Sequence, residues 1–122
     1  MKKRILVVDD NPSILDVLNE ILLEFEYDVK TVDRGEKVFD AIADYHPDLI
    51  LMDVMLAGMD GRNICKNIKA KTEYQAIPII LISANVSANN SKFEVGAPND
   101  FINKPFDLNN LIKRIEMQLA AA

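Results

Sequence analysis

Five polar residues lie at the ends of short apolar runs, where their side chains could combine into one reactive site. They are Asp9 and Asp10 after ILVV, Asp53 after LILM, Ser83 after IPIILI, and Lys104 after DFIN. The carboxyl ends of parallel strands meet at one edge of an α/β sheet, so we expect these side chains to share a crevice. Like charges held close together repel each other unless a cation offsets them, and a hard divalent cation prefers oxygen ligands. The pattern therefore predicts Mg²⁺ (or Mn²⁺) chemistry on a phosphoryl group.

The elements that must position these residues alternate between short apolar runs and stretches of helical period. This alternation is typical of βα units around a parallel sheet. Strands are predicted at 5–8, 29–32, 49–52, 79–82 and 101–102, and helices at about 12–25, 36–45, 61–71, 91–95 (short) and 107–119. The first, third and fourth strands are apolar without alternation, which indicates cover on both faces and a central place in the sheet.

Composition narrows the class of protein. The chain has 122 residues, of which 49% are hydrophobic, enough for one domain with a full core. Its net charge of -5 argues against direct nucleic-acid binding, and its single basic run, residues 1–4, has no apolar segment of signal-peptide type after it. We therefore expect a cytoplasmic protein with no membrane association. One cysteine and one histidine argue against a disulfide and against a Ser-His catalytic pair.

Each of the five residues, taken singly, has an ordinary structural explanation. Asp10 could cap the first helix, Asp9 and Asp53 could be strand-end carboxylates, and Ser83 and Lys104 could be solvated loop residues. Their joint occurrence at the ends of four different predicted strands is much less expected by chance, and it favours a functional site.

The order of these motifs is similar to that of a known family. Through LVVDDNP, LILMDVMLAGMDG, PIILISA and DFINKPF, the chain closely resembles the receiver domain of two-component response regulators. The resemblance covers nearly all of the chain, as one receiver domain at 1–122. It implies a doubly wound, flavodoxin-like α/β fold with a five-stranded parallel sheet in the order 2-1-3-4-5 and five helices, the fourth short or irregular.

The resemblance also implies roles for the acidic residues. Asp53 would be the nucleophile that attacks a phosphoryl group in line and becomes an acyl phosphate. Asp9, Asp10 and Asp53, together with the backbone carbonyl of Met55, would hold the metal ion.

The remaining roles fall on the last two strands. Lys104 would pair with the phosphoryl oxygens, and Ser83 would donate a hydrogen bond to them. Phe101 matches the aromatic switch position of the family, so phosphorylation would draw Ser83 inward and let the Phe101 ring rotate inward. The Lys104-Pro105 bond would be cis, which aims the lysine into the crevice.

Three departures from the family pattern concern the loops. Ala57 stands where the family usually has proline, so we expect a less rigid loop after Asp53. The segment 96–100 carries an inserted residue, and 86–95 is shorter than the usual fourth helix, so we expect 85–99 to be mobile or remodelled. Met55 and Asn85 occupy positions that tune hydrolysis in the family.

The competing interpretations are a flavodoxin-type FMN carrier, a phosphatase of the haloacid dehalogenase type, and a receiver that only docks to a partner. The acidic 9–12 segment would repel an FMN phosphate. The phosphatase needs a second aspartate at position 55, where this chain has methionine. The docking receiver stays open, although all five positions are filled.

The receiver interpretation makes this a signalling module rather than an enzyme on a separate substrate, although it would catalyse its own phosphorylation and dephosphorylation with Mg²⁺. The implied phosphodonor is a histidine kinase or a histidine phosphotransfer protein. Output would pass to a downstream protein or domain, and the chain would be a monomer or a weak phosphorylation-linked dimer. Whether it is a stand-alone protein or the excised regulatory domain of a larger one stays open.

Overall fold

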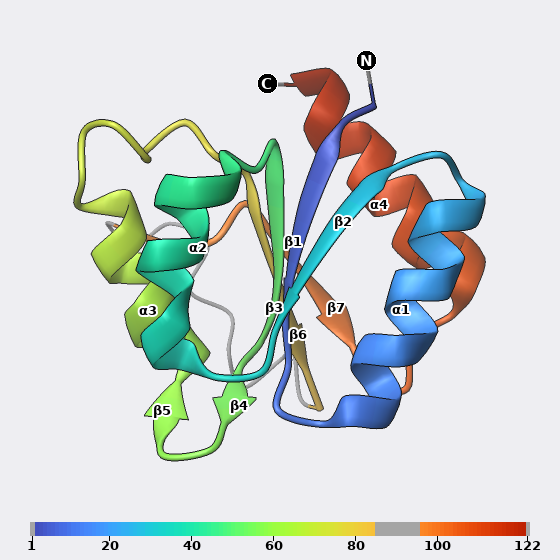
Figure 1. The fold of residues 1–122 in the computed structure, drawn as a ribbon, viewed down its shortest axis with the longest axis horizontal. Coiled ribbons are helices and arrows are strands. Elements are labelled where there is room, and N and C mark those ends of the chain that lie inside the picture. Colours follow the sequence, from blue (N-terminus) through green and yellow to red (C-terminus); the bar gives the residue numbers. More distant parts are fainter. Residues whose placement is uncertain (1, 85–95, 122) are drawn as a thin grey trace.

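A parallel five-stranded sheet forms the centre of the molecule (Figure 1). The computed structural model describes residues 2–84 and 96–121. The strands of this sheet are β1 (Arg4–Val8), β2 (Asp28–Val32), β3 (Leu49–Asp53), β6 (Ile79–Ser83) and β7 (Asp100–Asn103). They follow the order β2-β1-β3-β6-β7, with every neighbouring pair parallel. Counted along the chain, this is the expected order 2-1-3-4-5, and the flavodoxin-like fold is confirmed.

Helices cover both faces of the sheet. Helices α1 (Pro12–Glu24) and α4 (Leu108–Ala121) lie on one face, and α2 (Val38–Tyr45) and α3 (Gly61–Lys69) lie on the other (Figure 1). The sequence predicts that the second helix begins at about residue 36. In the structure, residues Gly35–Lys37 form a 3₁₀ turn, η1, and α2 begins at Val38. The short helix predicted at 91–95 lies outside the described residues. Within the described part of the chain, no helix is long and apolar enough to span a membrane.

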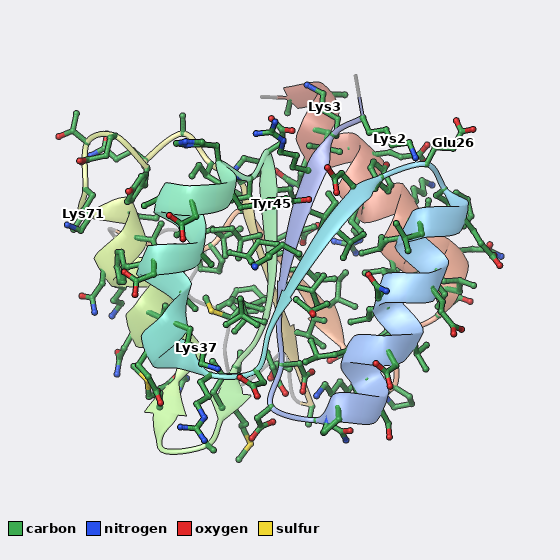
Figure 2. The ribbon with its side chains drawn as sticks, in the orientation of Figure 1. Lys2, Lys3, Glu26, Lys37, Tyr45 and Lys71 are labelled. Carbon is green, nitrogen blue, oxygen red and sulfur yellow. The ribbon has the colours of Figure 1, made fainter. Side chains whose placement is uncertain are left out.

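The three middle strands form the rigid part of the core. Every residue of the apolar runs in β1, β3 and β6 is at most 1% exposed. One buried cluster of side chains lies on the face covered by α2 and α3, and a second lies on the face covered by α1 and α4. Burial on both faces explains why these runs show no polar alternation, as expected for central parallel strands. The basic residues Lys2 and Lys3 lie at the end of the sheet away from the strand ends that carry the predicted site (Figure 2).

Two local features differ from the sequence interpretation. The cap of α1 is Asn11 and not Asp10, because the Asn11 side chain accepts hydrogen bonds from the backbone N–H groups of Ser13 and Ile14. The segment after Asp53 forms a two-stranded antiparallel hairpin of β4 (Met55–Leu56) and β5 (Met59–Asp60). Its two-residue turn uses Gly58 at a φ of +73°, a conformation that glycine adopts at little cost.

A partly buried ion pair joins the last strand to the last helix. The guanidinium Nη1 of Arg114 in α4 lies 2.7 and 2.8 Å from the two carboxylate oxygens of Asp100 in β7. Asp100 is 6% exposed, and one of its oxygens also accepts the backbone N–H of Phe101 at 2.8 Å. The pair therefore connects α4 to the strand that carries the predicted switch residue.

Removing the arginine tests how far this connection stabilises the fold. We expect Arg114→Ala to lower the free energy of unfolding by about 1–3 kcal/mol, because a buried carboxylate loses two charge-assisted hydrogen bonds. Urea denaturation at neutral pH measures the difference. Lys37→Ala is the matched control, since the Lys37–Asp33 pair has side chains 60% and 56% exposed, so water screens the pair and its loss should change stability little. Equal losses in the two variants would contradict the structural role of Arg114.

Candidate functional site

The ends of β1, β3, β6 and β7 bring the predicted site residues to one edge of the sheet. Asp53 and Ser83 are the last residues of β3 and β6, whereas Asp9 and Lys104 directly follow β1 and β7. Asp9, Asp53 and Ser83 are 1%, 5% and 4% exposed, and Asp10 lies exposed beside them. A backbone hydrogen bond between neighbouring strands helps to hold these ends in place: the Val54 N–H donates to the Ile82 carbonyl.

Lys104 contacts both buried carboxylates. Its Nζ lies 2.7 Å from Oδ2 of Asp53 and 3.6 Å from Oδ2 of Asp9. The second oxygen of each carboxylate accepts a backbone N–H two residues further along, from Met55 at 3.1 Å for Asp53 and from Asn11 at 2.9 Å for Asp9. Oδ2 of Asp9 is buried without a hydrogen-bond partner among the described residues. A buried carboxylate oxygen in this state requires a further positive partner.

The charges around Lys104 are unbalanced. Ligand oxygens of Asp9, Asp10 and Asp53 all lie within 4.8 Å of one another. Burial raises the pKa of Asp9 above its usual value, and the neighbouring charges of Asp53 and Asp10 raise it further. Burial alone would lower the pKa of Lys104, but the hydrogen bond to Asp53 and the charges of Asp9 and Asp53 outweigh it and raise that pKa. One ammonium thus faces three carboxylates, and an oxygen-preferring divalent cation fits the remaining donor set.

Two backbone contacts of Gly61 hold the end of β3 at Asp53, and neither was predicted from the sequence. A Cβ atom on Gly61, the first residue of α3, would collide with the carbonyl oxygen of Asp53. The Gly61 N–H donates to the carbonyl of Val54 at 2.7 Å, which closes the hairpin on the end of β3. The Asp60-Gly61 pair marked the start of a helix in the sequence, but its contact with Asp53 depends on folding across the loop.

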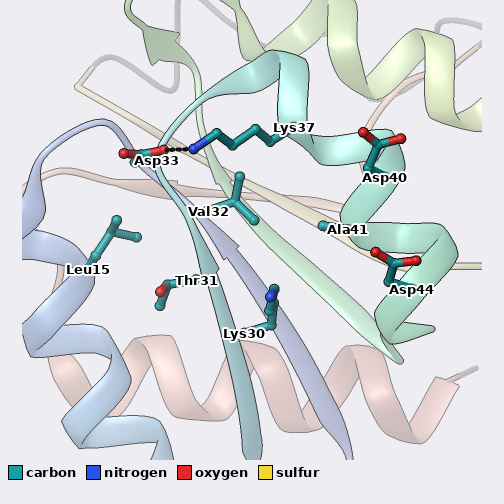
Figure 3. A pocket seen from close by; sticks show the side chains of 9 residues that line it. All are labelled: Leu15, Lys30, Thr31, Val32, Asp33, Lys37, Asp40, Ala41 and Asp44. Atoms are coloured by element: carbon teal, nitrogen blue, oxygen red, sulfur yellow. Dashed lines mark hydrogen bonds and ion pairs between the residues drawn. The ribbon is translucent and has the colours of Figure 1, made fainter.

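Two of the open hollows lined by described residues differ in their relation to the site. One of about 480 Å³ lies beside Asp53 and includes Met55, Met59, Arg62 and Ser83 in its lining. The other, of about 510 Å³, lies along β2 between α1 and α2 and contains none of the five predicted residues (Figure 3). Its lining includes the exposed Lys37–Asp33 pair, 3.1 Å apart. The candidate site is therefore identified by the three carboxylates gathered around Lys104, and not by the size of a hollow.

A family model of the response regulator receiver domain matches residues 5–116. The chain belongs to the receiver-domain family. It is 33% identical, over 98% of its length, to the DNA-binding response regulator MtrA of Mycolicibacterium smegmatis, and it spans about half (51%) of that relative. A protein assigned as a response regulator of Chloroflexus aurantiacus J-10-fl superposes with a TM-score of 0.90 at 31% identity, covering 98% of this chain and 99% of the other.

A further structural relative carries the metal. The receiver domain of the sensor histidine kinase PA1611 from Pseudomonas aeruginosa PAO1, 28% identical, superposes with a TM-score of 0.85 over 98% of this chain and 99% of its own. That structure has a magnesium ion coordinated in its active-site cleft. Its magnesium agrees with the donor set found here for a receiver.

Two further expectations for the receiver concern its last strand. The Lys104-Pro105 bond is cis, as predicted. Phe101 is 4% exposed and packs in the core cluster under α2 and α3. The ring is therefore buried in this structure, and its movement on phosphorylation stays a prediction.

The raised pKa of Asp9 has a consequence for stability. A carboxyl with a higher pKa in the folded than in the unfolded state binds its proton more tightly when folded, so ionisation destabilises the fold. Without Mg²⁺, the free energy of unfolding should therefore fall as pH rises from about 3.8 through the raised pKa. Asp9→Asn should remove this fall and stabilise the metal-free protein at pH 7.

The same variant tests the metal site. Mg²⁺ at about a hundred times its dissociation constant should stabilise the wild type by about 2.7 kcal/mol, and both Asp9→Asn and the exposed-site variant Asp10→Asn should reduce this gain. Thermal unfolding with and without Mg²⁺ measures it. Asp44→Asn, on the exposed surface of α2, is the control and should change neither quantity. An undiminished Mg²⁺ effect in both Asp9→Asn and Asp10→Asn would refute the assignment.

Proposed function

We propose that this receiver is a phosphorylation-dependent signalling switch that accepts a phosphoryl group on Asp53 with Mg²⁺. The single observation that carries the proposal is the contact of the Lys104 ammonium with a nearly buried Asp53 carboxylate at 2.7 Å, beside two further carboxylates. A metal ion held by Asp9, Asp10, Asp53 and the Met55 carbonyl supplies positive charge that offsets the acceptor and the incoming phosphoryl oxygens.

The chemistry requires position and charge more than covalent assistance. An oxygen of Asp53 attacks phosphorus in line, and the P–N bond of a phosphohistidine donor breaks with its electron pair leaving on the imidazole nitrogen. Lys104 then pairs with the phosphoryl oxygens, and Ser83 donates its hydroxyl hydrogen to one of them. Low exposure of Asp53 and Ser83 strengthens these interactions, because the local dielectric is low.

The chain would act as a signalling module with limited catalysis on itself. Small phosphodonors would phosphorylate Asp53, and water would later remove the group, both with Mg²⁺. A histidine kinase or a histidine phosphotransfer protein would be the cellular donor, and a downstream protein or domain would read the state. The cytoplasmic location and the weak, phosphorylation-linked dimer expected from the sequence remain predictions.

Helix α1 offers a docking surface for the donor beside the acceptor. Asn11, Ser13, Ile14 and Val17 line a shallow hollow of about 220 Å³ together with Phe106, which follows the cis peptide. Val17 is 50% exposed. Ile14 and Val17 are three residues apart and so share one helix face, which suits an apolar helix of a phosphohistidine protein.

The length of a relative favours a second arrangement. MtrA is about twice as long as this chain, since the chain spans 51% of it. In that arrangement the receiver is the regulatory domain of a larger protein, and its output passes within that protein. A receiver that only docks to a partner remains the alternative function. Mass spectrometry of Asp53 phosphorylation distinguishes it from the phosphorylation-dependent switch.

Intact-protein mass spectrometry tests the acceptor. After incubation with Mg²⁺ and a small phosphodonor, the wild type and the control Asp44→Asn should each gain one phosphoryl group. Asp53→Asn should gain none, because an amide oxygen is a far weaker nucleophile than a carboxylate. No gain on the wild type, with Mg²⁺ binding verified, would favour the docking-only receiver. A gain on Asp53→Asn would place the acceptor elsewhere.

Backbone NMR tests the switch. Phosphodonor with Mg²⁺ should shift the amide signals of β7 and α4 in the wild type, because Phe101 and the Asp100–Arg114 pair connect the site to those elements. Ser83→Ala should still be phosphorylated at Asp53 but should show smaller shifts at Phe101. Full shifts in Ser83→Ala would remove Ser83 from the switch, and shifts in Asp53→Asn would contradict the switch altogether.

A further inference from the structure

Met55 is the most exposed large apolar side chain in the described part of the molecule, at 76%. Its backbone N–H donates to Oδ1 of Asp53 at 3.1 Å, so this residue forms part of the immediate environment of the acceptor. Its side chain is accessible to small solutes and lines the same hollow as Ser83, while its backbone contacts the Asp53 carboxylate.

The other described methionines differ in their accessibility. Met52 is fully buried in β3, and Met117 is 57% exposed on α4. Met59 is 38% exposed, and its sulfur lies so close to Gly35 that a Cβ atom there would be 2.7 Å from it. An exposed methionine is more accessible to a dissolved oxidant than a buried one. By the exposure of the whole residue, the expected order of reactivity among the described methionines is Met55, Met117, Met59 and Met52.

The space around Met55 accommodates an oxidised side chain. The hollow of about 480 Å³ beside the acceptor is lined by Met55, Met59, Arg62 and Ser83 among others. A sulfoxide oxygen can enter this open space without displacing core side chains, unlike an oxygen added to Met52. Oxidation at this position should therefore leave the fold intact.

We propose that Met55 is a reversible oxidation site that links the lifetime of the phosphorylated state to peroxide. A sulfur lone pair of Met55 attacks one oxygen of hydrogen peroxide, the O–O bond breaks, and methionine sulfoxide and water form; the thioether is oxidised by two electrons and the peroxide is reduced. A methionine sulfoxide reductase reverses the change.

The expected effect on signalling rests on the proposed function. A sulfoxide replaces an apolar group at the edge of the site with an oxygen that carries partial negative charge and accepts hydrogen bonds. This oxygen repels a phosphoryl group on Asp53 and retains water beside it. Both effects favour hydrolysis, so oxidation of Met55 should shorten the lifetime of the acyl phosphate severalfold.

The first experiment measures the order of oxidation. Full-length protein is titrated with hydrogen peroxide, and peptide mass spectrometry reports sulfoxide at each methionine. Met55 should be oxidised at the lowest dose, before Met117, with Met52 unmodified while the circular dichroism spectrum is unchanged. Oxidation of Met117 with Met55 unmodified would overturn the proposal, and this result does not depend on phosphorylation.

The second experiment measures lifetime. Wild type, Met55→Leu and Met117→Leu are each phosphorylated with a small phosphodonor, with and without prior peroxide, and loss of the phosphoryl group is followed by intact mass. Peroxide should shorten the half-life in the wild type and in Met117→Leu but not in Met55→Leu, and a sulfoxide reductase should restore it. An unchanged half-life with fully oxidised Met55 would overturn the link. Absence of phosphorylation on untreated wild type would instead overturn the proposed function, and the link with it.

Discussion

Repulsion among three carboxylates is the constraint on which this structure depends. Asp9 and Asp53 are nearly buried beside exposed Asp10, with ligand oxygens within 4.8 Å of one another, and one ammonium from Lys104 contacts two of them. Burial amplifies the repulsion, and the raised pKa of Asp9 reflects this. A chain that keeps such a cluster gives up stability in its metal-free form. A divalent cation bound among these carboxylates would restore this stability.

The scaffold is built to hold that cluster against its own repulsion. The strands β1 and β3 lie side by side in the fully buried centre of the sheet; Asp9 directly follows β1, and Asp53 is the last residue of β3. Backbone N–H groups two residues after each aspartate fix one oxygen of each carboxylate. Gly61 lets α3 approach the Asp53 carbonyl more closely than any side chain would allow. Rigid support of this kind keeps the remaining oxygens directed at the shared space.

The site is connected to the surface through the last strand and helix. Lys104 follows β7 directly, Phe101 lies within it, and the Arg114–Asp100 pair joins β7 to α4. These contacts attach Lys104 and Phe101 to an element whose helix packs on the sheet. The β4–β5 hairpin after Asp53 leaves Met55 open to solvent. Asp53 thus has a firmly attached neighbour in β7 and an exposed one in the hairpin.

The sequence by itself indicated the central strands, because apolar runs without alternation are a local pattern with direct physical meaning. It also marked the five candidate site residues by their places at the ends of predicted strands, whereas the strand order was implied by the resemblance to receiver domains. Only the tertiary structure decided which atoms meet. The Lys104 contact with Asp53 spans 51 positions. The Lys104–Asp9 ion pair, the Gly61 approach and the Asp100–Arg114 pair depend equally on packing across strands. At the start of α1, the side chains of both Asp10 and Asn11 could cap the helix. Asn11 is the cap in the structure, and Asp10 lies with the other two carboxylates. Such choices are settled by long-range geometry, which no short window of sequence contains.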